Sequence, residues 1–428
     1  MNVRLAFLFG CRVLLALLGL GLSLAIAAAQ PNRELSAALA KENLAAVRAA
    51  VSVIRHALGS KAGEPEVADT YLPIPKAGRW LTATEARAGF KPEFGRFEKL
   101  IWWRVGLDPT TLTQALRAPA SFAAGNVAVA RAKLAGADQS RAYAVAAGDF
   151  LLWAQAQGGR GVYPFPAARG GKGGKPFAVA ERFLAKAETE GRLDQYVQHG
   201  WVINDANDGG LQFDNGECGV AMFELFELTR ESKYLASARQ AADWALARPL
   251  VANWNYNSFS VYLLAKAYQV TSEERYLTAA TKKAIIGVIP GQLTDGPRAG
   301  RWFDPHNARP AYHYIMLRGL AQLASVMPKS DPARGEIMRA LQSGLRARNQ
   351  DFFNQGVPNK DKAMETLLLV NRAFADEPEF LRAALVPAAL EALGKLVSEQ
   401  SRAGGQPLGF REWGLFLEEV TRQSPTNL

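Results

Sequence analysis

A helical repeat constrains the fold of this 428-residue chain more than any other feature of its sequence. Residues 223–246 read FELFELTRESKYLASARQAADWAL, and residues 261–285 read VYLLAKAYQVTSEERYLTAATKKAI. In both stretches a helix-forming run ends at Thr, a short charged turn follows, and an aromatic residue followed by Leu opens a second helix. These aromatic residues, Tyr234 and Tyr276, are 42 residues apart. A period of about 40 residues predicts repeated αα hairpins that bury their apolar stripes against one another.

The spacing of apolar residues supports an all-α fold. Four apolar residues lie at positions i, i+3, i+4 and i+7, which is one stripe of an amphipathic helix: Val261, Leu264, Ala265 and Tyr268. A further copy of the hairpin pattern surrounds Phe380, and the sequence has no long alternating β pattern. We expect an (α/α) toroid or barrel of repeated helix hairpins with an irregular N-terminal section.

The N-terminal end resembles a secretory signal peptide, because an apolar run is followed by three alanines. We therefore expect an exported protein, periplasmic or extracellular, with no membrane span after cleavage; an uncleaved anchor is the alternative. The predicted segments are a signal peptide at 1–29, a helical and irregular section at 30–119, the toroid at 120–400, and a C-terminal tail at 401–428 that packs on the toroid.

Long loops rich in Gly and aromatic residues recur at one type of junction, after the second helix of a hairpin and before the next hairpin. They are residues 158–176, 203–217, 248–258 and 291–310. Because these loops are topologically equivalent, we expect them to emerge on the same face and to line a shared cleft.

The charge balance favours a polyanionic ligand. Lys and Arg number 50 against 40 Asp and Glu, which gives a formal net charge of +10. For an exported protein this predicts an acidic polysaccharide or oligosaccharide as the partner, and no nucleic acid. The sequence carries no indication of the oligomeric state.

Two stretches are similar to a known superfamily. The stretch 213–246, beginning FDNGECGVAMFELFELT, resembles the polar Asp-Asn turn and helix hairpin of the (α/α)-toroid carbohydrate-active enzymes, the six-hairpin glycosidase-like superfamily. The stretch 148–166, GDFLLWAQAQGGRGVYPFP, is locally similar to a loop of the family 10 pectate lyases, with Gly-Gly-Arg-Gly-Val-Tyr-Pro in place of Gly-Gly-Trp-Pro. No position matches the catalytic arginine of those lyases. The resemblance covers about residues 138–325 and implies a toroid that acts on carbohydrate.

A group of carboxylates at the start of a predicted helix is the first candidate for catalysis. Glycosidases place two carboxylates across the scissile bond, one of them with a raised pKa. We predict catalytic roles for Asp214 and Glu217, and substrate-binding roles for Asp205, Asp208 and Asn215. The alternative is that Asp214 or Asn215 caps the helix and the other side chains are solvated.

The same loop suggests a metal only weakly. Asp205, Asn207 and Gly210 match positions 1, 3 and 6 of a calcium loop, but Gly216 stands where a bidentate Glu is required. No cofactor is therefore specified, and a looser calcium site with oxygen ligands stays open as an alternative. The four histidines are dispersed, which argues against zinc.

The segment 301–319, RWFDPHNARPAYHYIMLRG, is the second candidate. β-Elimination of a uronan needs a group that binds the carboxylate, a base, and an acid for the leaving oxygen. Arg309 or Asn307 could take the first role, and His306, Tyr312 or His313 the other two. The alternative is a packing loop whose aromatic residues close the end of the barrel.

Aromatic residues on the inserted loops are candidates for stacking on sugar rings. We predict substrate binding by Tyr163, Trp254, Tyr256 and Trp302, against the alternative of local packing. Together these features predict an exported enzyme that cleaves an acidic, uronate-containing polysaccharide by β-elimination. The alternatives are a six-hairpin glycoside hydrolase with a carboxylate pair, and a non-catalytic glycan-binding or envelope protein.

Overall fold

The computed structural model describes residues 32–65, 69–90, 116–167, 178–303 and 308–423. The predicted signal peptide and the candidate site residues His306 and Asn307 lie outside these ranges. Within the described ranges, no helix combines the length and the apolar character that crossing a membrane requires.

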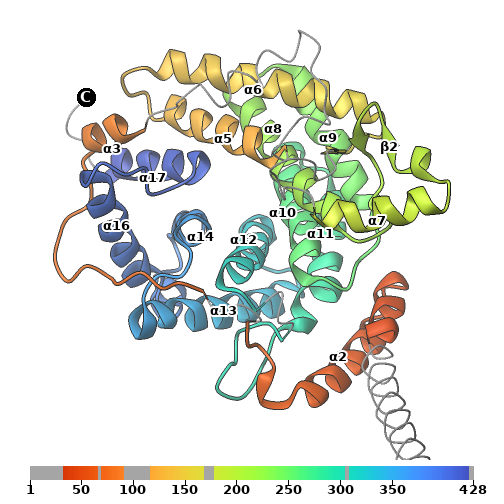
Figure 1. The fold of residues 1–428 in the computed structure, drawn as a ribbon. Coiled ribbons are helices and arrows are strands. Elements are labelled where there is room, and N and C mark those ends of the chain that lie inside the picture. Colours follow the sequence, from red (N-terminus) through yellow and green to blue (C-terminus); the bar gives the residue numbers. More distant parts are fainter. Residues whose placement is uncertain (1–31, 66–68, 91–115, 168–177, 304–307, 424–428) are drawn as a thin grey trace, which may run out of the picture.

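A closed ring of helices forms the centre of the described structure. Each helix of this inner ring packs against the next, and the last packs against the first (Figure 1). Most residues of α8, α10 and α12 are buried, as expected for helices with neighbours on all sides. The structure is therefore an all-α toroid, which confirms the predicted fold class. Within the described residues the ring consists of α5 (Arg117–Arg131), α8 (Gly210–Thr229), α10 (Trp254–Thr271), α12 (Pro310–Val326), α14 (Lys360–Ala373) and α17 (Phe410–Gln423).

A second layer of helices covers this ring from outside. The outer helices alternate with the inner ones along the chain, and each packs on the inner helix that precedes it or on that helix's neighbour (Figure 1). They are α6 (Ala137–Gly158), α9 (Ser232–Ala247), α11 (Glu274–Gly287), α13 (Arg334–Gln355) and α16 (Val386–Arg402), with the short α15 (Pro378–Ala383) before α16.

The 42-residue repeat corresponds to equivalent contacts in space. Tyr234 at the start of α9 donates a hydrogen bond from its hydroxyl to Asp149 of α6, at 3.0 Å. Tyr276 at the start of α11 donates in the same way to Asp243 of α9, at 2.8 Å. α9 and α11 are thus each anchored to the outer helix before them by a buried tyrosine, which gives the repeated tyrosine the same structural role in both units.

An insertion between α6 and α8 carries the β structure of the described chain. It contains α7 (Ala178–Thr189), the 3-10 helix η4 (Leu193–Gln195) and an antiparallel sheet of order β1-β3-β2. Phe165 of β1 and Val197 of β2 both lie opposite Val202 of β3. The buried β3 leads directly into the loop before α8. The strands are β1 (Phe165–Pro166), β2 (Val197–Gln198) and β3 (Trp201–Val202).

The N-terminal section wraps around the outside of the ring (red and orange in Figure 1). Its first helical stretch is interrupted after residue 40, and the side chain of Asn43 accepts a hydrogen bond from the N–H of Ala46 and caps a new helix, α2 (Leu44–Leu58). α2 and the 3-10 helix η1 (Gly59–Lys61) follow each other, and α2 packs on α11 and on the 3-10 helix η5 (Ile289–Gly291). Further along, α3 (Ala83–Gly89) packs on α17.

The C-terminal segment differs most from its prediction as a tail on a toroid that ends at residue 400. α17 is itself an inner helix: it packs between α5 and α14 and closes the ring. The indole N–H of Trp413 donates to the carbonyl oxygen of Ala86 at 3.1 Å, which also joins α17 to α3. α17 is not followed by the second helix of a hairpin within the described residues, and α3 covers it from the other end of the chain.

Ring closure between α5 and α17 depends on two glycines that allow the backbones to touch. A Cβ on Gly125 would lie 2.2 Å from the carbonyl oxygen of Phe410, and a Cβ on Gly414 would lie 2.4 Å from the carbonyl oxygen of Gly125. Both distances are far below van der Waals contact with atoms that cannot rotate away.

We therefore expect Gly125→Ala or Gly414→Ala to lower the free energy of unfolding by about 2–3 kcal/mol, because the two backbones must separate. Denaturant unfolding followed by circular dichroism measures this. Gly335→Ala, in α13, is the matched control, since its new Cβ would have only a side-chain nitrogen of Arg339 nearby, at 3.5 Å. Equal stabilities of the α5 or α17 variant and this control would contradict the tight α5–α17 contact.

Candidate functional site

The N-terminal ends of α8, α10, α12, α14 and α17 lie at one end of the ring, because each follows an outer helix along the chain. The start of α5 lies at the same end, where Arg117 contacts Asp214 of α8. Several side chains gather at this end, which we call the mouth. Asp208, Asp214 and Arg117 of α5 are close enough to the phenol of Tyr256 in α10 to act electrostatically on its pKa. The hydroxyl of Tyr312 in α12 acts on it in the same way. The mouth cluster is defined as Arg117, Asp208, Phe213, Asp214, Tyr256 and Tyr312.

An ion pair between Arg117 and Asp214 is the centre of the mouth cluster. The Arg117 Nη2 lies 2.9 Å from Asp214 Oδ2, and its Nε lies 3.2 Å from Oδ1. The guanidinium also lies over the ring of Phe213, 3.8 Å from its centroid. Asp214 is fully buried, whereas 39% of the Arg117 side chain is exposed. One face of this cation is therefore held by the protein while the side chain still reaches solvent.

Burial shifts the pKa of two groups in the mouth cluster. It raises the pKa of the Asp214 carboxyl above its ordinary value, and the nearby Arg117 opposes this shift without cancelling it. Burial likewise raises the pKa of Tyr256 to about 12, so its phenol is neutral at physiological pH. The site thus offers a phenol that can donate a proton, next to a carboxyl whose proton affinity is increased.

A network of buried charges lies inside the ring below the mouth. Arg318 of α12 donates to Glu217 at 2.9 Å and to Glu365 of α14 at 2.6 Å. Arg411 of α17 donates to the same Glu365 at 2.6 Å and to Glu224 of α8 at 2.8 Å. Its arginines therefore connect α8, α12, α14 and α17. We define the lumen network as Glu217, Glu224, Arg318, Lys362, Glu365, Arg411 and Glu412.

Lys362 extends this network toward the mouth. Its Nζ lies 3.0 Å from Glu365, 3.1 Å from Glu412 and 3.7 Å from Glu217. Burial raises the pKa of Glu217, but the charges of Arg318 and Lys362 outweigh it and hold the pKa below its ordinary value. Glu217 is therefore an ionised partner in a buried ion pair, which leaves its carboxylate little freedom for the catalytic role predicted from the sequence.

Three of the predicted sugar-binding aromatic residues belong to the core instead. Tyr163, Trp254 and Trp302 are 0–1% exposed, so none of their rings has a free face for a sugar. The hydroxyl of Tyr163 lies 2.5 Å from that of Ser237, and the indole N–H of Trp302 donates to the carbonyl oxygen of Val288 at 2.9 Å. Among these aromatic predictions, only Tyr256 is half-exposed at the mouth.

Two predicted polar site residues organise the backbone. Asp205 is buried, accepts hydrogen bonds from the N–H groups of Gly209 and Leu211, and pairs with Arg248. Asn215 is buried: its Oδ1 accepts from the N–H of Tyr163 at 3.2 Å, and its Nδ2 donates to the carbonyl of Ala241 at 2.9 Å. These contacts fix the entrance to α8, so neither side chain is available to a substrate.

His313 is also buried, in α12 just below the mouth. Its Nε2 accepts a hydrogen bond from the backbone N–H of Trp302 at 3.4 Å, and the two rings pack together. It therefore helps to hold Trp302 in place, and its catalytic role stays a prediction. Arg309, directly before α12, is half-buried and keeps its place among the candidates near the mouth.

The loop proposed for calcium does not fit this ion. Both oxygens of Asp205 accept hydrogen bonds from N–H groups, and Arg248 already neutralises the carboxylate. Among the described residues, no group of three or more His, Cys, Asp or Glu side chains could hold a metal ion.

Sequence reasoning missed Arg117, Arg318, Lys362, Glu365 and Arg411. Only a weak signal existed: Arg318 interrupts the apolar run IMLRGLAQLA of α12, and Glu365 lies among the apolar residues of α14. A charge on a helix that is buried all round must have a buried partner. The sequence could not show which other helix supplies that partner.

No protein-family model and no curated protein matches this chain. Among solved structures it is similar to a glycosyl hydrolase family 88 protein from Bacteroides vulgatus, with 11% identity, a TM-score of 0.46, and coverage of 81% of this chain and 99% of that chain. It is also similar to a polysaccharide lyase, with 13% identity, a TM-score of 0.46 and the same coverage. Neither is described as a family 10 pectate lyase.

The lumen network predicts a specific loss of stability in acid. The pKa values of Glu217 and Glu365 are lower in the folded protein than their ordinary value of 4.5. The stability that these groups contribute is therefore fully present above that value, and is lost as the pH falls through the lower, folded pKa. We expect Glu365→Gln to lower the free energy of unfolding by about 3 kcal/mol at pH 7, because Arg318 and Arg411 lose a shared partner.

The measurement is urea unfolding of the wild type and Glu365→Gln from pH 7 to pH 3, and the difference between them should shrink below pH 4.5. Glu336→Gln, which removes one exposed partner of Arg48, is the matched control and should change little. A difference that persists undiminished at pH 3 would contradict the assignment of an ionised Glu365.

Proposed function

We propose that this protein is an exported carbohydrate-active enzyme, periplasmic or extracellular, that cleaves an acidic, uronate-containing polysaccharide at the mouth of its ring. The observation that carries the proposal is the partly exposed Arg117, held by Asp214 and Phe213. Two tyrosines from neighbouring inner helices stand with it in the mouth cluster. A fixed cation beside phenols suits a substrate with a carboxylate and a proton to be moved.

The favoured reaction is β-elimination. Arg117, with Arg309 as a second cation, would bind the uronate carboxylate and stabilise the negative charge that develops when the neighbouring C–H proton leaves. Tyr256 is assigned to the leaving oxygen, because its raised pKa of about 12 keeps the phenol protonated. Tyr312 or His306 would take the C–H proton. The C–O bond to the leaving sugar breaks as a C=C bond forms.

Glycoside hydrolysis is the second candidate, and the Asp214 carboxyl favours it. A carboxyl whose pKa is raised by burial is the usual general acid of glycosidases. The exposed Asp208, on the loop before α8, would be the second carboxylate. A non-catalytic glycan-binding protein is the third candidate, favoured by the full pairing of Glu217 within the lumen network.

Product analysis separates these candidates. The protein without residues 1–29 would be incubated with polygalacturonate, alginate and hyaluronan, with dextran as a neutral control. We expect one uronan to yield products with an unsaturated end that absorbs ultraviolet light. New reducing ends without this absorbance would replace the lyase proposal with hydrolysis. Binding without either product would favour the glycan-binding candidate.

Tyr256→Phe tests the mouth cluster itself. This change removes one oxygen and keeps the ring, so we expect kcat to fall about 100-fold or more while the thermal midpoint stays near that of the wild type. Tyr268→Phe is the matched control: it lies on the same helix α10, and its hydroxyl donates to Glu274 near the opposite end of the helix. Equal activity of the two variants would remove Tyr256 from the proposed mechanism.

A further inference from the structure

A groove separate from the mouth cluster lies on the rim of the ring, between the N-terminal section and the loop before α12. It has a volume of ≈ 580 Å³. Its walls are the end of α2 with η1 on one side and residues 293–298 on the other. The loop before α12 is one of the connections that lead to the mouth. We define the rim groove by Arg55, His56, Ser60, Asp295 and Arg298.

The walls of the rim groove are held together, and the space between them is open. Arg298 donates hydrogen bonds from Nη1 to the carbonyl oxygens of Ser60, at 2.9 Å, and Ala62, at 3.3 Å. A Cβ added at Gly59 or at Gly296, one on each wall, would have nothing within 4 Å. The groove is thus a preformed hollow whose two sides come from segments more than 200 residues apart.

One ion pair in the rim groove can be exchanged for a ligand. The Nη2 of Arg55 lies 3.2 Å from both carboxylate oxygens of Asp295, which also accepts a hydrogen bond from the hydroxyl of the adjacent Thr294 at 3.1 Å. The Asp295 side chain is 76% exposed and the Arg55 side chain 28% exposed. Water and salt weaken such a pair, so an incoming carboxylate can replace Asp295 at the same guanidinium edge. His56 and Ser60 are exposed beside it and can donate hydrogen bonds to sugar hydroxyls.

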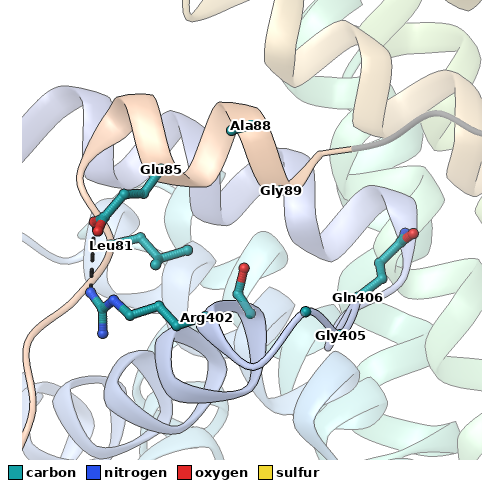
Figure 2. A pocket seen from close by; sticks show the side chains of 9 residues that line it. Leu81, Glu85, Ala88, Gly89, Arg402, Gly405 and Gln406 are labelled. Atoms are coloured by element: carbon teal, nitrogen blue, oxygen red, sulfur yellow. Dashed lines mark ion pairs between the residues drawn. The ribbon is translucent and has the colours of Figure 1, made fainter.

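The groove in Figure 2, between α3 and the loop before α17, lacks this property. There Arg402 faces Glu85, at 3.6 Å, and Glu85 also receives two hydrogen bonds from Arg79, at 2.7 and 2.8 Å. The same carboxylate accepts from the N–H of Thr82 as part of a capping box. Glu85 is therefore held by several partners, and displacing it from Arg402 would break more hydrogen bonds than displacing Asp295 from Arg55.

We infer that the rim groove is a second binding site for an acidic glycan, in which a uronate carboxylate takes the place of Asp295 on Arg55. The substrate class rests on the proposed function; the site itself does not depend on catalysis. A chain bound at both the mouth and the rim groove gains affinity through a high local concentration of the second segment. The rim groove would therefore favour long chains over short ones.

Two substitutions at this pair should act in opposite directions. Asp295→Asn frees Arg55, so we expect the Kd for polygalacturonate to fall about 5-fold. Arg55→Gln removes the carboxylate-binding group, so we expect the Kd to rise about 10-fold. Both are measured by isothermal titration calorimetry on the protein without residues 1–29, with the Tyr256→Phe change in every protein to slow cleavage of the polymer. Dextran serves as the neutral polymer and trigalacturonate as the short chain.

Asp376→Asn is the matched control, because it makes the same change of charge at an exposed ion pair, with Lys329, outside the groove. Equal tightening by Asp295→Asn and Asp376→Asn would overturn the inference in favour of general charge attraction. Unchanged affinity in Arg55→Gln would overturn it as well. If the rim variants behave as expected but no uronan is cleaved by the wild-type mouth, the rim site stands and the proposed enzymatic function fails.

Discussion

The shared carboxylate of Glu365 is the interaction on which the interior of this protein depends. It receives hydrogen bonds from Arg318 and from Arg411, and so joins inner helices that are distant in sequence. A toroid of this kind has a lumen too wide for apolar side chains from the ring to fill completely. Placing charges there carries a large desolvation penalty, which is offset only when every charge finds a partner of opposite sign. The network meets this condition for each arginine that it contains.

The network also limits where a substrate could bind. Below the mouth, Glu217 and its neighbours are committed to one another, so a substrate would have to break buried ion pairs to bind there. At the mouth the pairing is incomplete: Arg117 is held by Asp214 but reaches solvent, and Tyr256 is half-exposed. Asp205 and Trp302, on segments that lead to the mouth, are buried and bonded to the backbone. A cation held in place but only partly paired suits a preorganised site, which catalysis and tight binding both require.

The sequence supported the fold better than the site. The repeat that contains Tyr234 and Tyr276 predicted the helix hairpins, because an apolar stripe and an anchoring tyrosine are local features that recur with each unit. It did not predict that α17 enters the ring, since the partner that covers α17 is α3, from the other end of the chain. For the site, residue type alone could not separate Trp254 and Trp302, which are buried, from Tyr256, which is not. Loop position predicted that these residues share one end of the ring, but burial depends on contacts that no single segment encodes.

The closure of the ring by α17 has a consequence for the synthesis of the protein. α5 leaves the ribosome nearly 300 residues before α17, and until then it lacks one of its two neighbours in the ring. Glu365 likewise lacks its partner Arg411 until α17 has been synthesised. The final packing step thus joins the two ends of the toroid over a very long stretch of chain, which is slow by the general dependence of folding rate on contact order. A nascent or truncated chain without its last helix exposes a charged, half-open lumen, and is a natural substrate for chaperones and proteases.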